Sequence, residues 1–264
     1  MDLFIGPDAG IWCRSIAGWD GFRAALQEGT EPNARYPGPI PDLLPEREGR
    51  RAPLHVRLAL EAAAQACHNN FVAAEDVLTV FASSMGDSEI TDYMCRTLAG
   101  PAPMLSPTRF HNSVHNAASG YWSIGATNRH ASVAIAASPH TFTAALLEAA
   151  SLAITEAATV LLIVHDVPAP PPVDAISGNR QPFSAAFLLA PGAVTPQWRQ
   201  VRLECRQAAV EWPEPSTAWL RELAAENECA RALPLLEALA SKEKASLRWP
   251  LAEAAALDLR LGNG

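Results

Sequence analysis

Residues 111–164 read HNSVHNAASGYWSIGATNRHASVAIAASPHTFTAALLEAASLAITEAATVLLIV, and this stretch decides the fold. Residues 131–137 are small or β-branched, and residues 159–164 form a second apolar run. Between them, residues 141–155 have the composition of an almost wholly apolar helix, which must be buried on nearly all sides. Two apolar strands that flank such a helix predict a parallel βαβ unit inside a layered α/β domain.

The turn between the first predicted strand and the buried helix is Ser138-Pro139-His140. In open α/β sheets, the ends of strands and the starts of helices are where chemical groups usually gather. The side chains of this turn therefore carry most of the functional argument.

Composition excludes several classes of protein. The chain has 264 residues, 49% of them hydrophobic, enough for one large domain with a sizeable core. With 20 basic and 28 acidic residues and no basic run, binding to nucleic acid or to anionic membranes is not expected. Glu148 and Glu156 interrupt the longest apolar segment, so we expect no membrane insertion. The start has no leader pattern and the five cysteines form no CxxC pair, so we expect a cytoplasmic protein.

The rest of the chain predicts layers around the central unit. Residues 77–83 predict a buried strand, and residues 88–99 predict a helix capped by Asp87 or Ser88. Residues 183–189 and 198–206 predict two strands that could pair as a hairpin around Pro191-Gly192. We expect a single α/β domain with a mixed, mostly parallel sheet and a buried central helix. Its body spans residues 1–210, and a short helical or irregular tail, residues 211–264, packs on it.

Several catalytic motifs are missing from the sequence. His111 and His115 are four residues apart, but no acidic partner stands beside them in an HExxH pattern, so we expect no metal site. The sequence contains no GxSxG, GxGxxG or Walker pattern, so neither a hydrolase elbow nor a cofactor is predicted. None of the cysteines begins the 141–155 helix, where the helix dipole would lower a thiol pKa.

Small motifs follow one another in a recognisable order in the central segment. Ser106-Pro107 precedes a loop, Asn116 and Gly120 stand four apart, and Arg129 precedes the 131–137 strand. From about residue 77 to residue 164, this order resembles the N-terminal half of β-ketoacyl-acyl carrier protein synthases, which have the thiolase fold. In that family a His replaces Tyr121, Arg129 matches the Arg of an LRG turn, and the strand carries the nucleophile elbow.

Two departures from the family pattern govern the expected function. The family's nucleophilic Cys aligns with Pro139, between Ser138 and His140, and proline offers neither a nucleophile nor an N–H for an oxyanion hole. The family's two active-site histidines and its Gly-rich segment belong to a C-terminal half, and no such motifs follow Arg206. The resemblance therefore implies a relative with no catalytic residue.

This combination resembles the short chain length factors of aryl polyene and related bacterial pigment pathways. The resemblance implies a non-catalytic partner in fatty acid or polyene biosynthesis. It would form a heterodimer with an active ketosynthase, shape its acyl tunnel and meet the acyl carrier protein only indirectly. Residues 129–137 would pair with the matching strand of the partner, and the loop 105–116 would approach its tunnel. The expected interface or tunnel residues are Phe110, His111, Asn116, Tyr121, Trp122, Arg129, Ser132, Val133 and Ile135.

Other interpretations stay open at the level of the sequence. Ser138 or His140 could serve an acyl-carrier decarboxylase or hydrolase, and the chain could instead be a stand-alone homodimeric scaffold. Phe110, His111, Tyr121 and Trp122 could equally be ordinary packing residues under the sheet. An apolar edge strand without a partner promotes aggregation, so we expect poor solubility of the chain alone.

Overall fold

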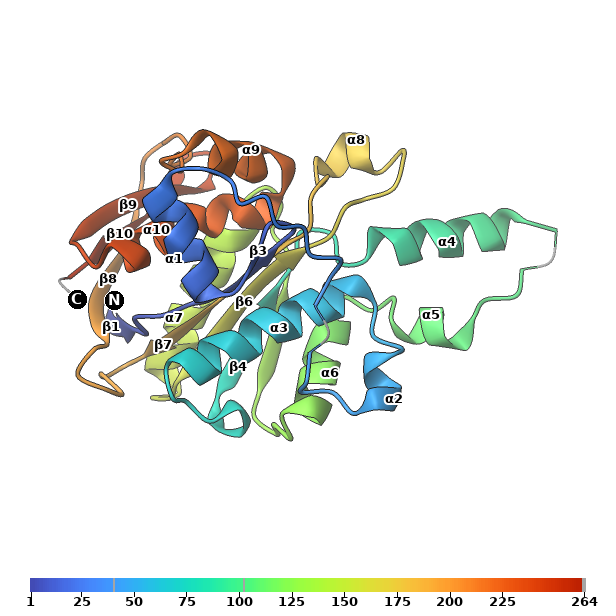
Figure 1. The fold of residues 1–264 in the computed structure, drawn as a ribbon, viewed down its shortest axis with the longest axis horizontal. Helices are drawn as coiled ribbons and strands as arrows, with labels where there is room; N and C mark the ends of the chain where they lie inside the picture. The colour runs from blue at the N-terminus through green and yellow to red at the C-terminus, as the bar shows by residue number, and fades with distance from the viewer. Residues whose placement is uncertain (40, 102, 263–264) are drawn as a thin grey trace.

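The computed structural model of the protein describes residues 1–39, 41–101 and 103–262 (Figure 1). The strands are β1 (Asp2–Ile5), β2 (Gly10–Cys13), β3 (Ile16–Ala17), β4 (Leu78–Ala82), β5 (Ser132–Ile135), β6 (Val160–Asp166), β7 (Phe183–Ala190), β8 (Arg199–Arg206), β9 (Ala245–Ala252) and β10 (Ala255–Leu261). The helices are α1 (Trp19–Glu28), α2 (Glu46–Gly49), α3 (Leu54–Asn69), α4 (Ser88–Ala99), α5 (Pro107–His111), α6 (Ala117–Gly125), α7 (Thr141–Thr155), α8 (Asp174–Ser177), α9 (Ala218–Glu226) and α10 (Leu233–Ser241). Two short 3-10 helices are η1 (Ala74–Asp76) and η2 (Glu228–Ala232).

The strands form one sheet in the order β5-β4-β6-β7-β1-β8-β10-β9, with β2 and β3 attached beside β7. Pairing is parallel where β4 meets β5 and β6, and antiparallel in the other pairs. The predicted mixed sheet is confirmed, and its parallel part is the core that holds the βαβ unit. Within that unit β4 lies between β5 and β6, so the crossover through α7 skips one strand.

The predicted hairpin of residues 183–189 with residues 198–206 is wrong. β7 and β8 do not pair with each other, because the N-terminal strand β1 lies between them and bonds to both. A Pro-Gly pair indicates only that the chain turns. The connection of residues 191–198 is long enough to pass over one strand, which needs a span of about 10 Å.

Helices cover the sheet on two faces. α7 lies with α1, α9 and α10 over one face, and α3 and α6 lie over the other. β6 serves both layers, because alternate residues of a strand point to opposite faces: Val160, Leu162 and Val164 join the first core, and Leu161 and Ile163 the second. α7 has the predicted bounds and is largely buried. No helix among the residues described here has the length and apolar character needed to span a membrane.

The C-terminal segment is not the purely helical or irregular tail that we expected. After α9, η2 and α10 it forms the β9–β10 hairpin, which extends the sheet through β8. The apolar residues of ASLRWPLA alternate only in part, and β10 is buried along most of its length, so neither strand has a simple two-residue burial pattern. The segment packs on its own chain through β8.

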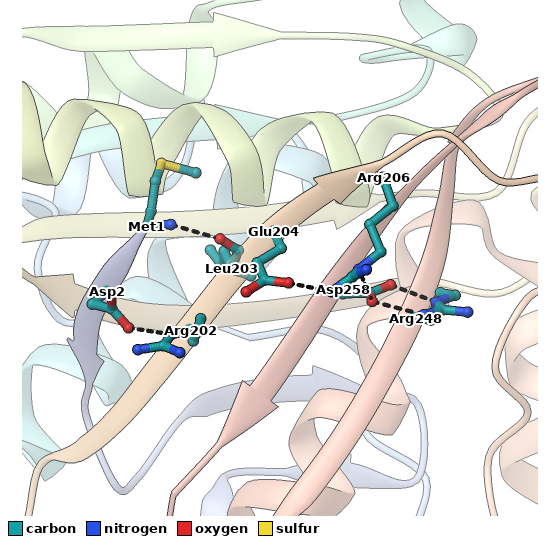
Figure 2. A network of polar contacts seen from close by, with 8 residues as sticks. All are labelled: Met1, Asp2, Arg202, Leu203, Glu204, Arg206, Arg248 and Asp258. Atoms are coloured by element: carbon teal, nitrogen blue, oxygen red, sulfur yellow. Dashed lines mark hydrogen bonds and ion pairs between the residues drawn. The ribbon is translucent and has the colours of Figure 1, made fainter.

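A polar network covers the outer face of this part of the sheet (Figure 2). Arg202 pairs with Asp2 at 2.6 Å, and Asp258 pairs with Arg206 at 2.9 Å and with Arg248. The Arg202–Asp2 pair is exposed, and such a pair contributes little stability, about 0–1 kcal/mol. The main consequence of these pairs is that this face of the sheet carries charged side chains, which disfavour association with other proteins through it.

α4 and α5 form an arm that projects from the body of the molecule, as Figure 1 shows. The predicted N-cap is confirmed, since the Asp87 carboxylate accepts a hydrogen bond from the Ile90 amide at 3.0 Å. Three large apolar side chains of the arm are exposed: Leu98, Met104 and Phe110, with 57%, 84% and 60% of their surface accessible. So much apolar surface on one projection is typical of a contact surface.

Candidate functional site

The turn between β5 and α7 lacks the groups of a nucleophile elbow. Ser138, Pro139 and His140 occupy it, and the Ser138–Pro139 peptide bond is cis. The His140 amide donates to the Ala137 carbonyl at 2.6 Å, and the Ala137 amide donates to Thr141 Oγ1 at 3.2 Å. These bonds close the turn on itself, so two of the amide donors that could face an oxyanion are already used.

Side chains from the C-terminal segment contact Ser138 and His140 of the same turn. Ser138 Oγ donates to Glu228 Oε2 at 2.6 Å. The His140 ring stacks on the Trp212 ring, with 5.5 Å between the ring centroids. The Arg231 guanidinium also lies over the Trp212 ring, 4.7 Å from its centroid. The hydroxyl therefore faces a carboxylate, not an imidazole, so the geometry of a Ser-His nucleophile pair is not formed.

A buried polar cluster fixes the strand ends behind the turn. Asp166 at the end of β6 accepts from Ser83 Oγ at 2.7 Å and from Ser84 Oγ at 2.6 Å. The Asn227 amide reaches back to the Asp166 carbonyl at 3.2 Å, which ties β6 to the C-terminal segment. Burial raises the pKa of Asp166, and the serine hydroxyls act in the opposite direction. Because its members are bonded to one another, the cluster serves to position the strand ends.

The buried cysteine beside this cluster lies in surroundings that disfavour its thiolate form. Cys229 lies against Asp166 and the Ala82 carbonyl, with Sγ 3.9 Å from that oxygen. Burial, together with the neighbouring Asp166 and Glu228 carboxyls, raises the pKa of the Cys229 thiol well above its ordinary value. A thiol that stays protonated at neutral pH has little reactivity.

The two histidines at four-residue spacing point to different partners. His111 lies exposed on α5, with its ring edge-on to Tyr121 at 6.5 Å, whereas His115 Nε2 bonds to the Ser83 carbonyl at 2.9 Å. Within the part of the chain that the structure describes, no three His, Cys, Asp or Glu side chains are placed to hold a metal ion.

A second histidine group lies buried at the base of the arm. His55 Nδ1 bonds to Asp87 Oδ2 at 3.0 Å, and the His165 ring stacks on His55 at 6.1 Å. Burial, and then the neighbouring His55 and His115, lower the pKa of His165 well below 6.5. His165 is therefore neutral in the folded protein at neutral pH.

The low pKa of His165 predicts an acid-sensitive stability. The unfolded chain binds this proton at a pKa of about 6.5, and the folded chain does not. The stabilising contribution of neutral His165 is thus fully present above pH 6.5. Below that pH the free energy of unfolding falls by up to about 1.4 kcal/mol per pH unit. We expect His165→Phe to flatten the slope of unfolding free energy between pH 7 and pH 5, measured by urea denaturation. The matched control is His68→Phe at an exposed position, and equal slopes in both variants would contradict the prediction.

β5 is the edge strand on the other side of the turn. The carbonyls of Ala131 and Ile135 accept from β4 amides at 3.2 Å each. In a parallel ladder the alternate residues, Ser132 and Ala134, direct their backbone groups away from β4. Ser132 also accepts from Thr79 Oγ1 at 2.8 Å. The strand contains no proline or charged residue to discourage pairing.

The predicted interface residues fall into two groups. Phe110, His111, Asn116, Arg129 and Ser132 are exposed, and Val133 and Ile135 are half-buried at the edge. Tyr121 and Trp122 are buried in the core under α3 and α6, so their assignment to a partner surface is corrected. Their burial agrees with the alternative that they are ordinary packing residues. No sequence pattern indicates Trp212 or Glu228, because their contacts with the turn are long-range in the chain.

Comparison with known proteins agrees with this geometry. A family model described as "Beta-ketoacyl synthase, N-terminal domain" matches residues 25–249. No curated protein matches the chain. One chain of the ketosynthase (ApeO) in complex with its chain length factor (ApeC) from Xenorhabdus doucetiae is similar, with a TM-score of 0.73 and 20% identity over 98% of this chain and 99% of that chain. A chain of the ishigamide ketosynthase/chain length factor has a TM-score of 0.69 and 18% identity over 99% of both chains.

These similarities show a shared fold along nearly the whole chain. A type II polyketide ketosynthase in complex with its acyl-carrier protein (AntDE:AntF) reaches a TM-score of 0.74 at only 8% identity, so the fold extends well beyond close relatives. The family match covers far more than half of the sequence. The chain therefore belongs to the family of β-ketoacyl synthase N-terminal domains.

Proposed function

We propose that the chain is a non-catalytic chain length factor that forms a heterodimer with an active β-ketoacyl-acyl carrier protein synthase in the cytoplasm. The observation that carries this proposal is a contrast between two neighbouring features. The β5–α7 turn has Pro139 at the expected nucleophile position, with Ser138 bonded to Glu228 and His140 stacked on Trp212, while β5 beside it is open for pairing. In this proposal the β5 edge binds the partner, and the β5–α7 turn takes no part in catalysis, as expected of a non-catalytic subunit.

The edge of the sheet supports pairing with another strand. Addition of a partner strand to β5 would satisfy the outward backbone groups of Ser132 and Ala134 and extend the sheet across the interface. Two of the similar structures are described as a ketosynthase with its chain length factor, which favours a ketosynthase as the partner over a second copy of this chain. The substrates would then reach the complex on an acyl carrier protein that serves the ketosynthase.

The arm supports a role in setting the length of the acyl product. Phe110 is exposed on α5, and Met104 and Leu98 lie exposed nearby in the sequence. Such side chains, inserted beside a partner's tunnel, would limit its apolar volume and thus the longest chain that fits. The product class in this proposal is a fatty acid or polyene of the aryl polyene type.

Catalysis by the turn is the alternative that the proposal must exclude by experiment. We expect Ser138→Ala and His140→Ala to leave the turnover of the complex with malonyl- and acyl-carrier protein within about twofold of the wild type, because neither group belongs to a nucleophile–base pair. Thioester consumption and product formation would be followed by mass spectrometry of the carrier protein. A loss of more than about tenfold in either variant would instead indicate a decarboxylase or hydrolase.

The tunnel role predicts a change in product length. Phe110→Ala in the complex removes a large exposed side chain, and we expect products longer by about one or two two-carbon units. The matched control is Ile124→Ala, which truncates an exposed apolar residue on α6 rather than on the arm. Liquid chromatography with mass spectrometry gives the distribution. An unchanged distribution in Phe110→Ala, or an equal shift in the control, would contradict the assignment.

A further inference from the structure

A cavity of about 480 Å³ lies where the arm joins the body, outside the β5–α7 turn. Its walls come from the start of α3, the base of α4, the α5 helix and the segment that follows β6. The volume lies within the range of about 300–1,000 Å³ that is usual for small-molecule sites. The proposed function makes no use of this cavity.

Three arginines line the cavity: Arg51, Arg57 and Arg109. Among the residues that the structure describes, no carboxylate lies within 4.0 Å of their guanidinium nitrogens. Two carboxyl groups also line the cavity, but Asp87 is engaged by His55 and by the Ile90 amide. Glu89 alone is left to balance three positive charges. In a chain with a net charge of −8, this local excess of positive charge is distinctive.

Contacts outside the cavity hold the guanidinium groups of Arg57 and Arg109 in place, and one holds the backbone of Arg51. Arg57 Nη1 donates to the Pro39 carbonyl at 3.1 Å, and its Nε is buried without a partner in the described chain. The Arg109 guanidinium lies 4.0 Å over the Tyr93 ring, and the Arg51 carbonyl accepts from Asn112 Nδ2 at 3.3 Å. Guanidinium groups that are already ordered lose less entropy when they bind an anion.

The remaining walls define the rest of the ligand. The first turn of α3 has backbone amides without a helical partner, and Pro53 supplies no side-chain cap, so this end of the cavity also favours an anion. Leu54, Ile90 and Val167 line the cavity with aliphatic groups. The combination fits a phosphate group, which arginine binds through paired hydrogen bonds, attached to a flexible aliphatic chain.

We propose that this cavity binds an organic phosphate, with Arg51, Arg57 and Arg109 on the phosphate and the aliphatic wall along its chain. The shared chemistry is a phosphate ester of an aliphatic alcohol. A free alkyl phosphate and the phosphate ester of pantetheine both have it. The site belongs to this chain alone, and the proposal does not depend on the ketosynthase partner.

The test is a titration of the full-length chain by microscale thermophoresis at nanomolar protein concentration. The probes are hexyl phosphate and phosphopantetheine, and hexanol and pantetheine are the matched probes without phosphate. We expect at least one phosphate ester to bind with a Kd below about 1 mM and at least about tenfold more tightly than its phosphate-free counterpart. The better of the two esters identifies the source of the phosphate.

Variants locate the binding. We expect Arg51→Gln and Arg109→Gln, both at exposed positions, to weaken binding of that ester about five- to tenfold each, and the double variant about 30-fold or more. Arg47→Gln is the matched control, an exposed arginine on α2 that does not line the cavity. Weaker binding than 1 mM for both esters, equal binding of the phosphate-free probes, or a double variant that matches the control would each overturn the proposal.

Discussion

Replacement of Ala134 by proline is expected to weaken the complex with the ketosynthase by about 2–3 kcal/mol, roughly 30- to 150-fold in Kd. Ala134 stands opposite Phe81 in the register of β5 with β4, but the ladder bonds to β4 come from the residues on either side of it. Its own N–H and C=O face outward. Proline removes the N–H that a partner strand would use and places a ring in the path of that strand.

This variant separates pairing from folding. Because the lost N–H faces away from β4, we expect the unfolding free energy of the chain itself to change by less than about 1 kcal/mol. The matched control is Ala134→Val, which keeps the N–H and favours the strand. The affinity is measured by biolayer interferometry with immobilised ketosynthase. Proline and valine variants that bind equally well would show that β5 is not the contact strand.

The largest expected effect on stability comes from Arg199→Met. The Arg199 side chain is 1% exposed, and its guanidinium donates to the carbonyls of Ala238 at 2.9 Å, Gly262 at 2.6 Å and Glu243. Methionine has similar length and no donor, so one buried carbonyl, that of Ala238, and two partly buried ones lose their partner. We expect a loss of about 3–5 kcal/mol and a fall in Tm of about 10 °C.

The expected loss of stability is large because Arg199 connects several parts of the C-terminal segment. The three carbonyls belong to α10, to the connection before β9 and to the end of β10, so one side chain holds the whole C-terminal segment against β8. Arg260→Met is the matched control, since Arg260 is exposed on β10. Differential scanning calorimetry of both variants checks the expectation. A fall in Tm of less than about 2 °C for Arg199→Met would contradict it.

The central part of the fold could be predicted because its information is local. The bounds of α7 follow from an apolar run that only burial explains, and the predicted strands β4, β5 and β6 each have a continuous apolar or small-residue pattern. The Asp87 cap depends on residues three apart. The missing nucleophile at Pro139 can also be recognised from the sequence, because it is the identity of one residue.

What could not be predicted depends on contacts between distant parts of the chain. The Ser138–Glu228 bond joins residues 90 apart, and the stacking of Trp212 on His140 has no sequence pattern. The insertion of β1 between β7 and β8 is decided by the competition of strands for the same edge. Trp122 shows a related limit: periodicity indicates that a face is buried, but it does not indicate whether the same chain or a partner buries it.

The turn without a cysteine and the open edge strand together give one physical account of the chain. A nucleophile elbow needs a reactive side chain beside a base, and here Pro139 stands at that position while Ser138 bonds to Glu228 and His140 stacks on Trp212. An edge strand that remains unpaired exposes backbone groups and promotes aggregation. The account therefore makes a partner necessary for solubility and makes the partner the source of the chemistry.

Co-expression with a full-length ketosynthase from the same genome, followed by size-exclusion chromatography with light scattering, tests this account most directly. We predict that the two chains co-elute as a 1:1 complex, that the complex makes product, and that this chain alone is inactive and aggregates. A well-behaved monomer or homodimer of this chain that never co-elutes with the ketosynthase would contradict the account.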